Sequence, residues 1–108
     1  MQKLITKTEE KKQPLPDVKL VLKRILKFKK LGKFDLAIKE CKEALKSLPE
    51  DMNLHTELGD IFYEKHRNIF HPSDSIDDGI NEYQIALERN PSNASLHFKL
   101  GKAFYTKG

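Results

Sequence analysis

The chain has 108 residues, of which 33% are charged and 38% hydrophobic, and its formal net charge is +4. This length suits one small domain, and no apolar run approaches the roughly 18 residues that a membrane-spanning helix needs. The N-terminal residues do not have the apolar stretch of a secretory signal, and the single cysteine, Cys41, excludes an internal disulfide and a cysteine-rich zinc site. A reducing, cytoplasmic setting is therefore expected.

Positive charge is concentrated in the N-terminal half. Residues 1–48 contain 14 Lys and Arg against 6 Asp and Glu, whereas residues 49–108 contain 6 against 10. Lysines gathered in this way contact nucleic-acid phosphates in some proteins and only solubilise the surface in others. The aromatic residues of that half, Phe28 and Phe34, fall at predicted core positions, so no stacking platform for bases is left. Nucleic acid is therefore an alternative partner and not the expected one.

The chain is predicted to begin with a flexible charged tail, residues 1–16, followed by a helical domain at residues 17–108. Within the domain, apolar residues recur at intervals of three and four, which predicts helices. Gly32 and several prolines interrupt the pattern, and Asp17 is placed to cap the first helix by accepting backbone N–H bonds. The predicted helices span residues 18–31, 34–47, 52–65, 76–89 and 95–106.

The third and fifth predicted helices repeat one another. Residues 51–65, DMNLHTELGDIFYEK, and residues 93–107, NASLHFKLGKAFYTK, share seven of fifteen positions at a spacing of 42 residues, which is typical of repeat arrays. Glycine in mid-helix costs about 1 kcal/mol against alanine, so its recurrence indicates close approaches between helices. The shared pairs are Leu54/Leu96, His55/His97, Leu58/Leu100, Gly59/Gly101, Phe62/Phe104, Tyr63/Tyr105 and Lys65/Lys107.

Residues at helix-packing and turn positions recur in three segments: Phe28, Gly32, Phe34, Ala37, Cys41, Ala44 and Pro49; His55, Leu58, Gly59, Phe62, Ile76, Gly79, Tyr83, Ala86 and Pro91; and His97, Leu100, Gly101, Phe104 and Gly108. The joint pattern resembles the tetratricopeptide (TPR) repeat, a helix–turn–helix unit of 34 residues. The repeats span about residues 18–51, residues 52–93 with an insertion at 66–73, and an incomplete third at residues 94–108.

The resemblance implies an all-α fold of antiparallel helical hairpins, stacked as a right-handed superhelix of about two and a half repeats. It also implies a protein–protein interaction or scaffold module that binds a peptide or partner helix in a concave groove. About three stacked repeats are usually needed for stability. Because the last predicted helix carries Phe98, Phe104 and Tyr105 in place of a polar cap, we expect either a fragment of a longer protein or self-association through that helix.

In the family, the first helix of each repeat lines the groove, and the resemblance carries these positions over to this chain. Helical phase supports the assignment, because Asn53, Glu57, Asp60 and Glu64 share one helix face. The charges are expected either to bind a partner or to pair across neighbouring helices, which contributes about 0–1 kcal/mol per exposed pair. The expected groove residues are Lys19, Leu22, Leu26, Lys29 and Lys30, then Asn53, Thr56, Asp60, Tyr63 and Glu64, then Ser95, Phe98, Lys102, Tyr105 and Thr106.

Two of the groove positions bear on the mode of binding, and the histidines have separate roles. Some family members clamp a peptide's terminal carboxylate, but Leu22 and Leu26 stand at the corresponding positions here, which argues against a clamp. His55 and His97 are expected to pack in place of the family's tryptophan. His66 and His71 lack a metal-ligand spacing.

No nucleophile–base or acid–base arrangement stands out in the sequence. The chain is therefore predicted not to be an enzyme and to have no catalytic residue, cofactor or metal. The expected partner is another protein or a peptide, and no small-molecule substrate or membrane is expected. A remaining alternative is a spacer or oligomerisation part of a larger enzyme.

Overall fold

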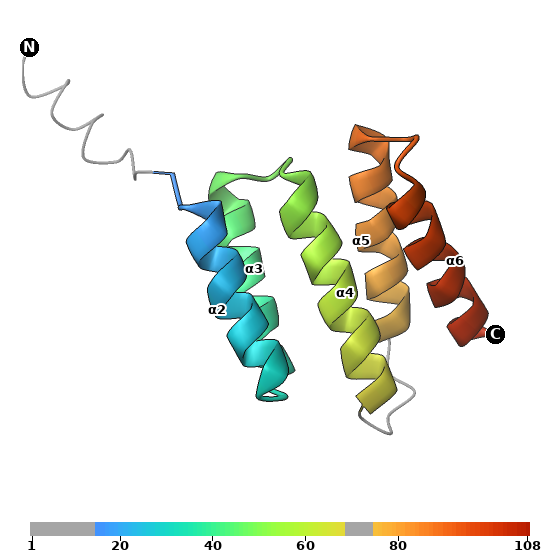
Figure 1. Ribbon diagram of the computed structural model, residues 1–108, viewed down its shortest axis with the longest axis horizontal. Coiled ribbons are helices and arrows are strands. Elements are labelled where there is room, and N and C mark those ends of the chain that lie inside the picture. The colour runs from blue at the N-terminus through green and yellow to red at the C-terminus, as the bar shows by residue number, and fades with distance from the viewer. Residues whose placement is uncertain (1–14, 69–74) are drawn as a thin grey trace, which may run out of the picture.

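The computed structural model describes residues 15–68 and 75–108. The described residues form five α-helices and no β-strand. The helices stand side by side in the order of the sequence, and successive helices run in opposite directions (Figure 1). The prediction of an all-α array of helical hairpins is confirmed. The helices are α2 (Val18–Lys30), α3 (Phe34–Ser47), α4 (Met52–Asn68), α5 (Ser75–Arg89) and α6 (Ala94–Lys107).

Short polar side chains begin several of these helices. The Asp17 carboxylate accepts hydrogen bonds from the backbone N–H groups of Lys19 and Leu20 at 3.0 and 3.4 Å, so the predicted cap of α2 is confirmed. Asn93 caps α6 in the same way. The end of α2 is set by Gly32, whose φ of 71° lies in the left-handed region that only glycine adopts without strain.

Helix α4 is longer than the sequence predicts. It was expected to end at about Lys65, but it continues through Asn68, whose side-chain amide donates to the Glu64 carbonyl oxygen at 2.8 Å. Residues 66–68, expected in the insertion, are therefore helical. The rest of the expected insertion, residues 69–73, lies outside the described residues, as does the expected tail up to residue 14.

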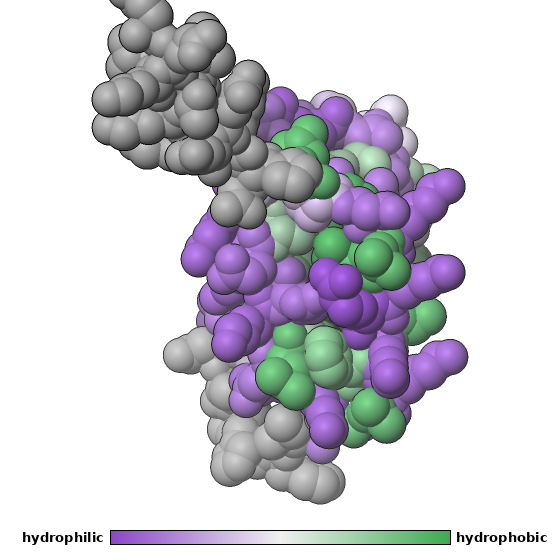
Figure 2. Space-filling model, turned by 90° about the vertical axis from the view of Figure 1, so that its left-hand side faces the viewer, coloured by the Kyte–Doolittle hydropathy of each residue, from purple (hydrophilic) through white to green (hydrophobic). Residues whose placement is uncertain are grey.

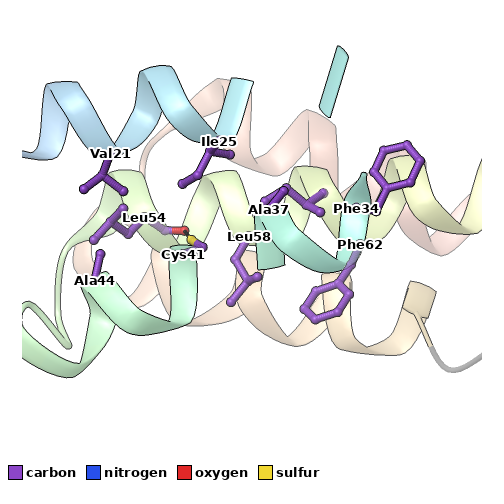
Figure 3. Close-up of a cluster of buried hydrophobic side chains, with 10 residues drawn as sticks. Val21, Ile25, Phe34, Ala37, Cys41, Ala44, Leu54, Leu58 and Phe62 are labelled. Carbon is purple, nitrogen blue, oxygen red and sulfur yellow. Dashed lines mark hydrogen bonds between the residues drawn. The ribbon is translucent and has the colours of Figure 1, made fainter. Parts of the chain in front are cut away.

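A first hydrophobic core lies between α2, α3 and α4. Val21 and Ile25 of α2 meet Cys41 of α3 and Leu54 and Leu58 of α4, and all five are almost completely buried (Figure 3). Burying one such side chain contributes about 1.5–3 kcal/mol. The Cys41 thiol also donates a hydrogen bond to the Leu54 carbonyl oxygen at 3.1 Å, so that polar and apolar contacts together hold α3 to α4.

A second core lies between α5 and α6, with Tyr83, Ala86, Leu96 and Ala103 at its centre. Tyr63 of α4 packs against it, so α4 contributes to both cores. This position in the middle of the row makes α4 the helix that ties the two ends of the molecule together.

The close approach predicted at Gly59 is confirmed. A methyl group on Gly59 would lie 2.6 Å from Cε1 of Tyr83, and one on Gly79 would lie 3.2 Å from the Gly59 carbonyl oxygen, so α4 and α5 meet glycine against glycine. The prediction is wrong at Gly101, where no atom lies within 4 Å of the position that a methyl group would take. The physical reason is that no described helix covers that side of α6.

The paired histidines differ in the same way. His55 is 8% exposed, as expected of a packed residue, and its Nε2 lies 2.7 Å from the Pro49 carbonyl oxygen. His97 makes the equivalent contact with the Pro91 carbonyl oxygen at 2.6 Å, but its side chain is exposed. The expected packing role therefore holds for His55 and fails for His97.

Candidate functional site

A hollow of about 490 Å³ lies between α4 and α6, and one side chain of α5 also lines it. Four of its lining residues were predicted for the groove, and four were not. It falls between the first helices of the second and third repeats, where the resemblance places the binding surface. The lining residues are Asp60, Tyr63, Glu64, Arg67 and Asn68 of α4, Tyr83 of α5, and Lys99 and Lys102 of α6.

The floor of the hollow is a hydrogen-bonded cluster centred on Asp60. The Tyr83 hydroxyl donates to Asp60 Oδ1 at 2.6 Å, and Lys99 Nζ contacts Asp60 Oδ1 at 3.0 Å and Oδ2 at 2.8 Å. Burial and the bond to Asp60 both raise the pKa of the Tyr83 hydroxyl, so it remains a donor. One carboxylate therefore joins three helices, and its charge is already used within the chain.

A second ion-pair cluster connects α2 to α4. Lys29 Nζ lies 2.9 Å from Glu57 Oε1 and 3.2 Å from Glu64 Oε2. Burial opposes the charge on Lys29, but the hydrogen bond and the attraction of Glu57, with a further contribution from Glu64, outweigh it and raise the pKa of the lysine. Lys29 is thus a charged residue whose ion pairs link α2 to α4. The expectation that groove charges pair across helices describes both Lys29 and Asp60.

The aromatic ring of Tyr63, in the hollow, lies close to two cations. Lys102 Nζ lies 5.2 Å from the centroid of the Tyr63 ring, and the Arg67 guanidinium lies 5.9 Å from it. Lys102 is also 5.4 Å from the Phe98 ring. Such contacts are worth about 0.5–1 kcal/mol at exposed sites. The Tyr63 hydroxyl meets the Thr106 hydroxyl at 3.2 Å, which fixes the ring across the gap between α4 and α6.

Arg67 and Lys102 differ from the other cations of the hollow in their pairing. Within residues 15–68 and 75–108, neither makes an ion pair, whereas Lys99 and Lys29 each do. Both side chains are exposed. The site therefore presents two cations that no described carboxylate neutralises, both close to the ring of Tyr63.

The structure brings together Asp60, Tyr63, Glu64 and Lys102 of the predicted groove residues, with Lys29 beside Glu64. The remaining predicted residues do not line the hollow. Thr56 is partly buried, and Phe98 and Tyr105 are 66% and 89% exposed on α6. Leu22 and Thr106 are partly buried, and the other exposed residues of the predicted groove are Lys19, Leu26, Lys30, Asn53 and Ser95.

Sequence reasoning missed four of the lining residues. Lys99 follows Glu57 by one spacing of 42 residues, and Glu57 had been placed on the groove face, so the repeat itself carried a signal for Lys99. Arg67 and Asn68 were missed because α4 was expected to end before them. Tyr83 matched a core position, and no pattern in the sequence indicates that its hydroxyl reaches the hollow.

In the described part of the chain, no group of three or more His, Cys, Asp or Glu side chains is arranged to hold a metal ion. Among the described residues, no helix combines the length and the apolar character needed to cross a membrane. Cys41 is buried, and burial, reinforced by the charges of Glu57, Glu82 and Asp51, raises the pKa of its thiol to about 12, so it is held in the unreactive form.

The C-terminal part of the chain is similar to a known family of repeats. Residues 68–108, which contain α5 and α6, match the family model described as TPR repeat. No curated protein matches the chain significantly. The matched segment begins at the last residue of α4 and includes Lys99 and Lys102, so it covers one side of the hollow.

Proposed function

We propose that the chain is a non-enzymatic scaffold that holds a peptide or partner helix in the groove along α2, α4 and α6. Its residues 68–108 match the TPR repeat, and such repeats generally mediate protein–protein interaction. The observation that carries the proposal is the hollow in which Arg67 and Lys102 both lie close to the ring of Tyr63. Two exposed cations around a fixed ring offer a partner both charge and a flat apolar surface.

The chemistry of the site favours a partner segment that carries carboxylates. The hollow is lined by three cations, Arg67, Lys99 and Lys102, against the two carboxylates of Asp60 and Glu64, so the charge left for a partner is positive. Hydrogen bonds between a guanidinium or ammonium group and a carboxylate are roughly twice as strong as neutral ones. Charge complementarity of this kind determines partner choice and association rate more than total affinity.

The hollow also has the dimensions of a binding site. Its volume of about 490 Å³ lies in the range of roughly 300–1,000 Å³ that ligand sites occupy. Lys29 and Asp60 support the walls through their ion pairs, whereas Tyr63, Arg67 and Lys102 make the contacts with the partner. The exposed rings of Phe98 and Tyr105 extend the contact surface along α6.

A peptide-display selection tests this proposal. We expect the purified chain to enrich segments that combine Asp or Glu with an apolar residue, and to bind the resulting peptides in fluorescence anisotropy. Arg67→Glu and Lys102→Glu should each weaken binding by about tenfold, equivalent to roughly 1.4 kcal/mol. Lys39→Glu is the matched control, since Lys39 is an exposed lysine of α3 that does not line the hollow. Equal binding by all three variants would show that the groove is wrongly assigned.

Nucleic-acid binding by the basic half is the alternative, and the aromatic residues there argue against it. Phe34 is buried and Phe28 is partly buried against the first core. Figure 2 shows the end of the row formed by α2 and α3, which is mainly hydrophilic with separate hydrophobic spots. Unrelated RNA or DNA that binds this chain at high salt, and more tightly than any selected peptide, would favour the alternative. We expect a reducing, cytoplasmic setting, which suits the free thiol of Cys41.

A further inference from the structure

Helix α6 presents a face that its repeat partner, α4, keeps covered. On α4, this face consists of His55, Gly59 and Phe62, spaced i, i+4 and i+7, and it lies under α5. The same three residue types recur on α6 as His97, Gly101 and Phe104, which we call the α6 face. Phe62 is 7% exposed, whereas Phe104 is 48% exposed, and His97 and Gly101 are exposed as well.

The covered copy shows how such a face receives a helix. Gly79 of α5 approaches Gly59, and the Tyr83 ring lies directly over Gly59. Glu82, the residue before that tyrosine, places its carboxylate 2.7 Å from Nδ1 of His55. The histidine ring is held for this contact because its other nitrogen is bound to the Pro49 carbonyl oxygen. Helix α5 thus binds through glycine, glutamate and tyrosine in the order Gly79-Ile80-Asn81-Glu82-Tyr83.

His97 on the α6 face is already oriented in the same manner. Its Nε2 lies 2.6 Å from the Pro91 carbonyl oxygen, which leaves Nδ1 free to meet a carboxylate. Gly101 has nothing within 4 Å of its missing methyl group, so the site over it can accept a ring. Both recognition groups of the covered copy are therefore present, and the protein surface around them is open.

One difference between α4 and α6 indicates which chemical groups a helix that binds α6 must carry. Where α4 has Asp60, which accepts from the Tyr83 hydroxyl, α6 has the donor Lys102. Helix α6 carries Lys99, Lys102 and Lys107 and no acidic residue, whereas α5 carries four acidic residues and one basic one. A helix that binds α6 must therefore offer acceptors and negative charge.

We propose that the α6 face binds an acidic amphipathic helix of a partner protein, which repeats the contact of α5 with α4. The partner helix places an aromatic residue with an oxygen acceptor over Gly101, within reach of Lys102. The carboxylate before that residue meets His97, and a small residue one turn earlier allows the backbones to approach. His97, Gly101 and Phe104 do not line the hollow, and Lys102 is the one residue that both proposals use, so this proposal goes beyond groove binding.

A second copy of this chain fits the α6 face less well than an acidic partner does. Two α6 helices packed together would bring lysines against lysines, which is unfavourable. Within each chain, α5 already covers α4, so it is not available to a second molecule. The exposed aromatic residues of the last helix led us to expect self-association through it. Self-association is therefore a competing outcome of the experiment described next.

The probe is a synthetic helix with the sequence of α5, SIDDGINEYQIALER, held helical by a staple that replaces Gln84 and Glu88, two positions exposed in α5. We expect it to bind the full chain in fluorescence anisotropy. Gly101→Leu should weaken binding by about tenfold or more, and so should a peptide with Ala in place of Tyr83, because each removes the ring-over-glycine contact. Arg67→Glu, a groove variant, should leave binding of this helix unchanged, which separates this proposal from the previous one.

Three outcomes would overturn the proposal. One is that the stapled helix does not bind. Another is that it binds Gly101→Leu as tightly as the natural chain, which would mean that it displaces the internal α5 from α4. The third is a dimer of the chain alone, seen by analytical ultracentrifugation and abolished by Gly101→Leu, which would assign the α6 face to self-association. Because Gly101 has open space around it, this variant should keep its circular dichroism spectrum and melting temperature.

Discussion

The ring of Tyr83 covers Gly59 so closely that a methyl group on this glycine would lie 2.6 Å from Cε1 and 2.7 Å from Cδ1. The ring cannot move aside freely, because its hydroxyl is bonded to Asp60 at 2.6 Å. This contact is related to both surfaces discussed above, because Asp60 lies in the floor of the hollow and Gly59 is the covered counterpart of Gly101. The two glycines therefore form a matched pair for mutagenesis.

Gly59→Ala is expected to destabilise the protein. Overpacking a filled contact costs about 1–3 kcal/mol, and the better helix propensity of alanine offsets only about 1 kcal/mol of it. The free energy of unfolding, measured by urea denaturation, should fall. A variant as stable as the natural chain would mean that α4 and α5 have room to separate.

Gly101→Ala is expected to change stability in the opposite direction. Its added methyl group meets no atom within 4 Å, so only the conformational effect remains, and alanine is favoured over glycine in a helix by about 0.5–1 kcal/mol. The same urea titration should show a gain. A loss at this position would indicate that some part of the chain packs over α6 in solution.

Asp60→Ala is expected to lower the free energy of unfolding by about 1–3 kcal/mol, because it leaves the buried Tyr83 hydroxyl without its acceptor and Lys99 without its ion pair. Glu50→Ala is the control, since its ion pair with Arg89 is exposed and such pairs contribute about 0–1 kcal/mol. Thermal unfolding of both variants checks the difference. Similar losses for the two would mean that the Asp60 cluster is as weak as a surface pair.

His55→Ala and His97→Ala form a second matched pair. Removing His55 leaves the Pro49 carbonyl and the Glu82 carboxylate without a partner in a nearly buried place, which costs about 1–3 kcal/mol for an unsatisfied group. Removing His97 exposes only the Pro91 carbonyl to water. Urea denaturation should rank His55→Ala as clearly less stable, and the reverse order would contradict the assignment of the covered and open faces.

Cys41 is expected to resist alkylation in the folded protein. Burial is the main cause of its high pKa of about 12, so almost no thiolate is present at pH 8, and the thiol is bonded to Leu54. Iodoacetamide followed by mass spectrometry should show slow modification in buffer and complete modification in denaturant. Rapid labelling of the folded chain would show that α3 separates easily from α4.

The sequence predicted the helices well because their boundaries depend on local chemistry. Asp17 caps α2 and Gly32 ends it through contacts within a few residues, and both are visible in the sequence. The end of α4 was missed because residues 66–68 contain nothing that breaks a helix, and the next proline, Pro72, lies four residues farther along the sequence.

The site was predictable only as a surface. The resemblance and the helical phase predicted which helix faces line a groove, but whether the charges there bind a partner or one another depends on distances between helices. That question was decided by Lys29 and Asp60, which pair across helices. Lys102 and Arg67 remain without ion pairs among the described residues, and no sequence pattern distinguishes them from the lysines that pair.

The main helix contacts join only neighbours in the sequence, from α2 with α3 through to α5 with α6. Contacts of short sequence separation need only small loops to close, and chains of this kind fold quickly. During synthesis from the N-terminus, α2 and α3 can pair before α5 has left the ribosome. Each hairpin that emerges then has the previous one as a surface on which to fold, so the chain needs no distant segment to begin its structure.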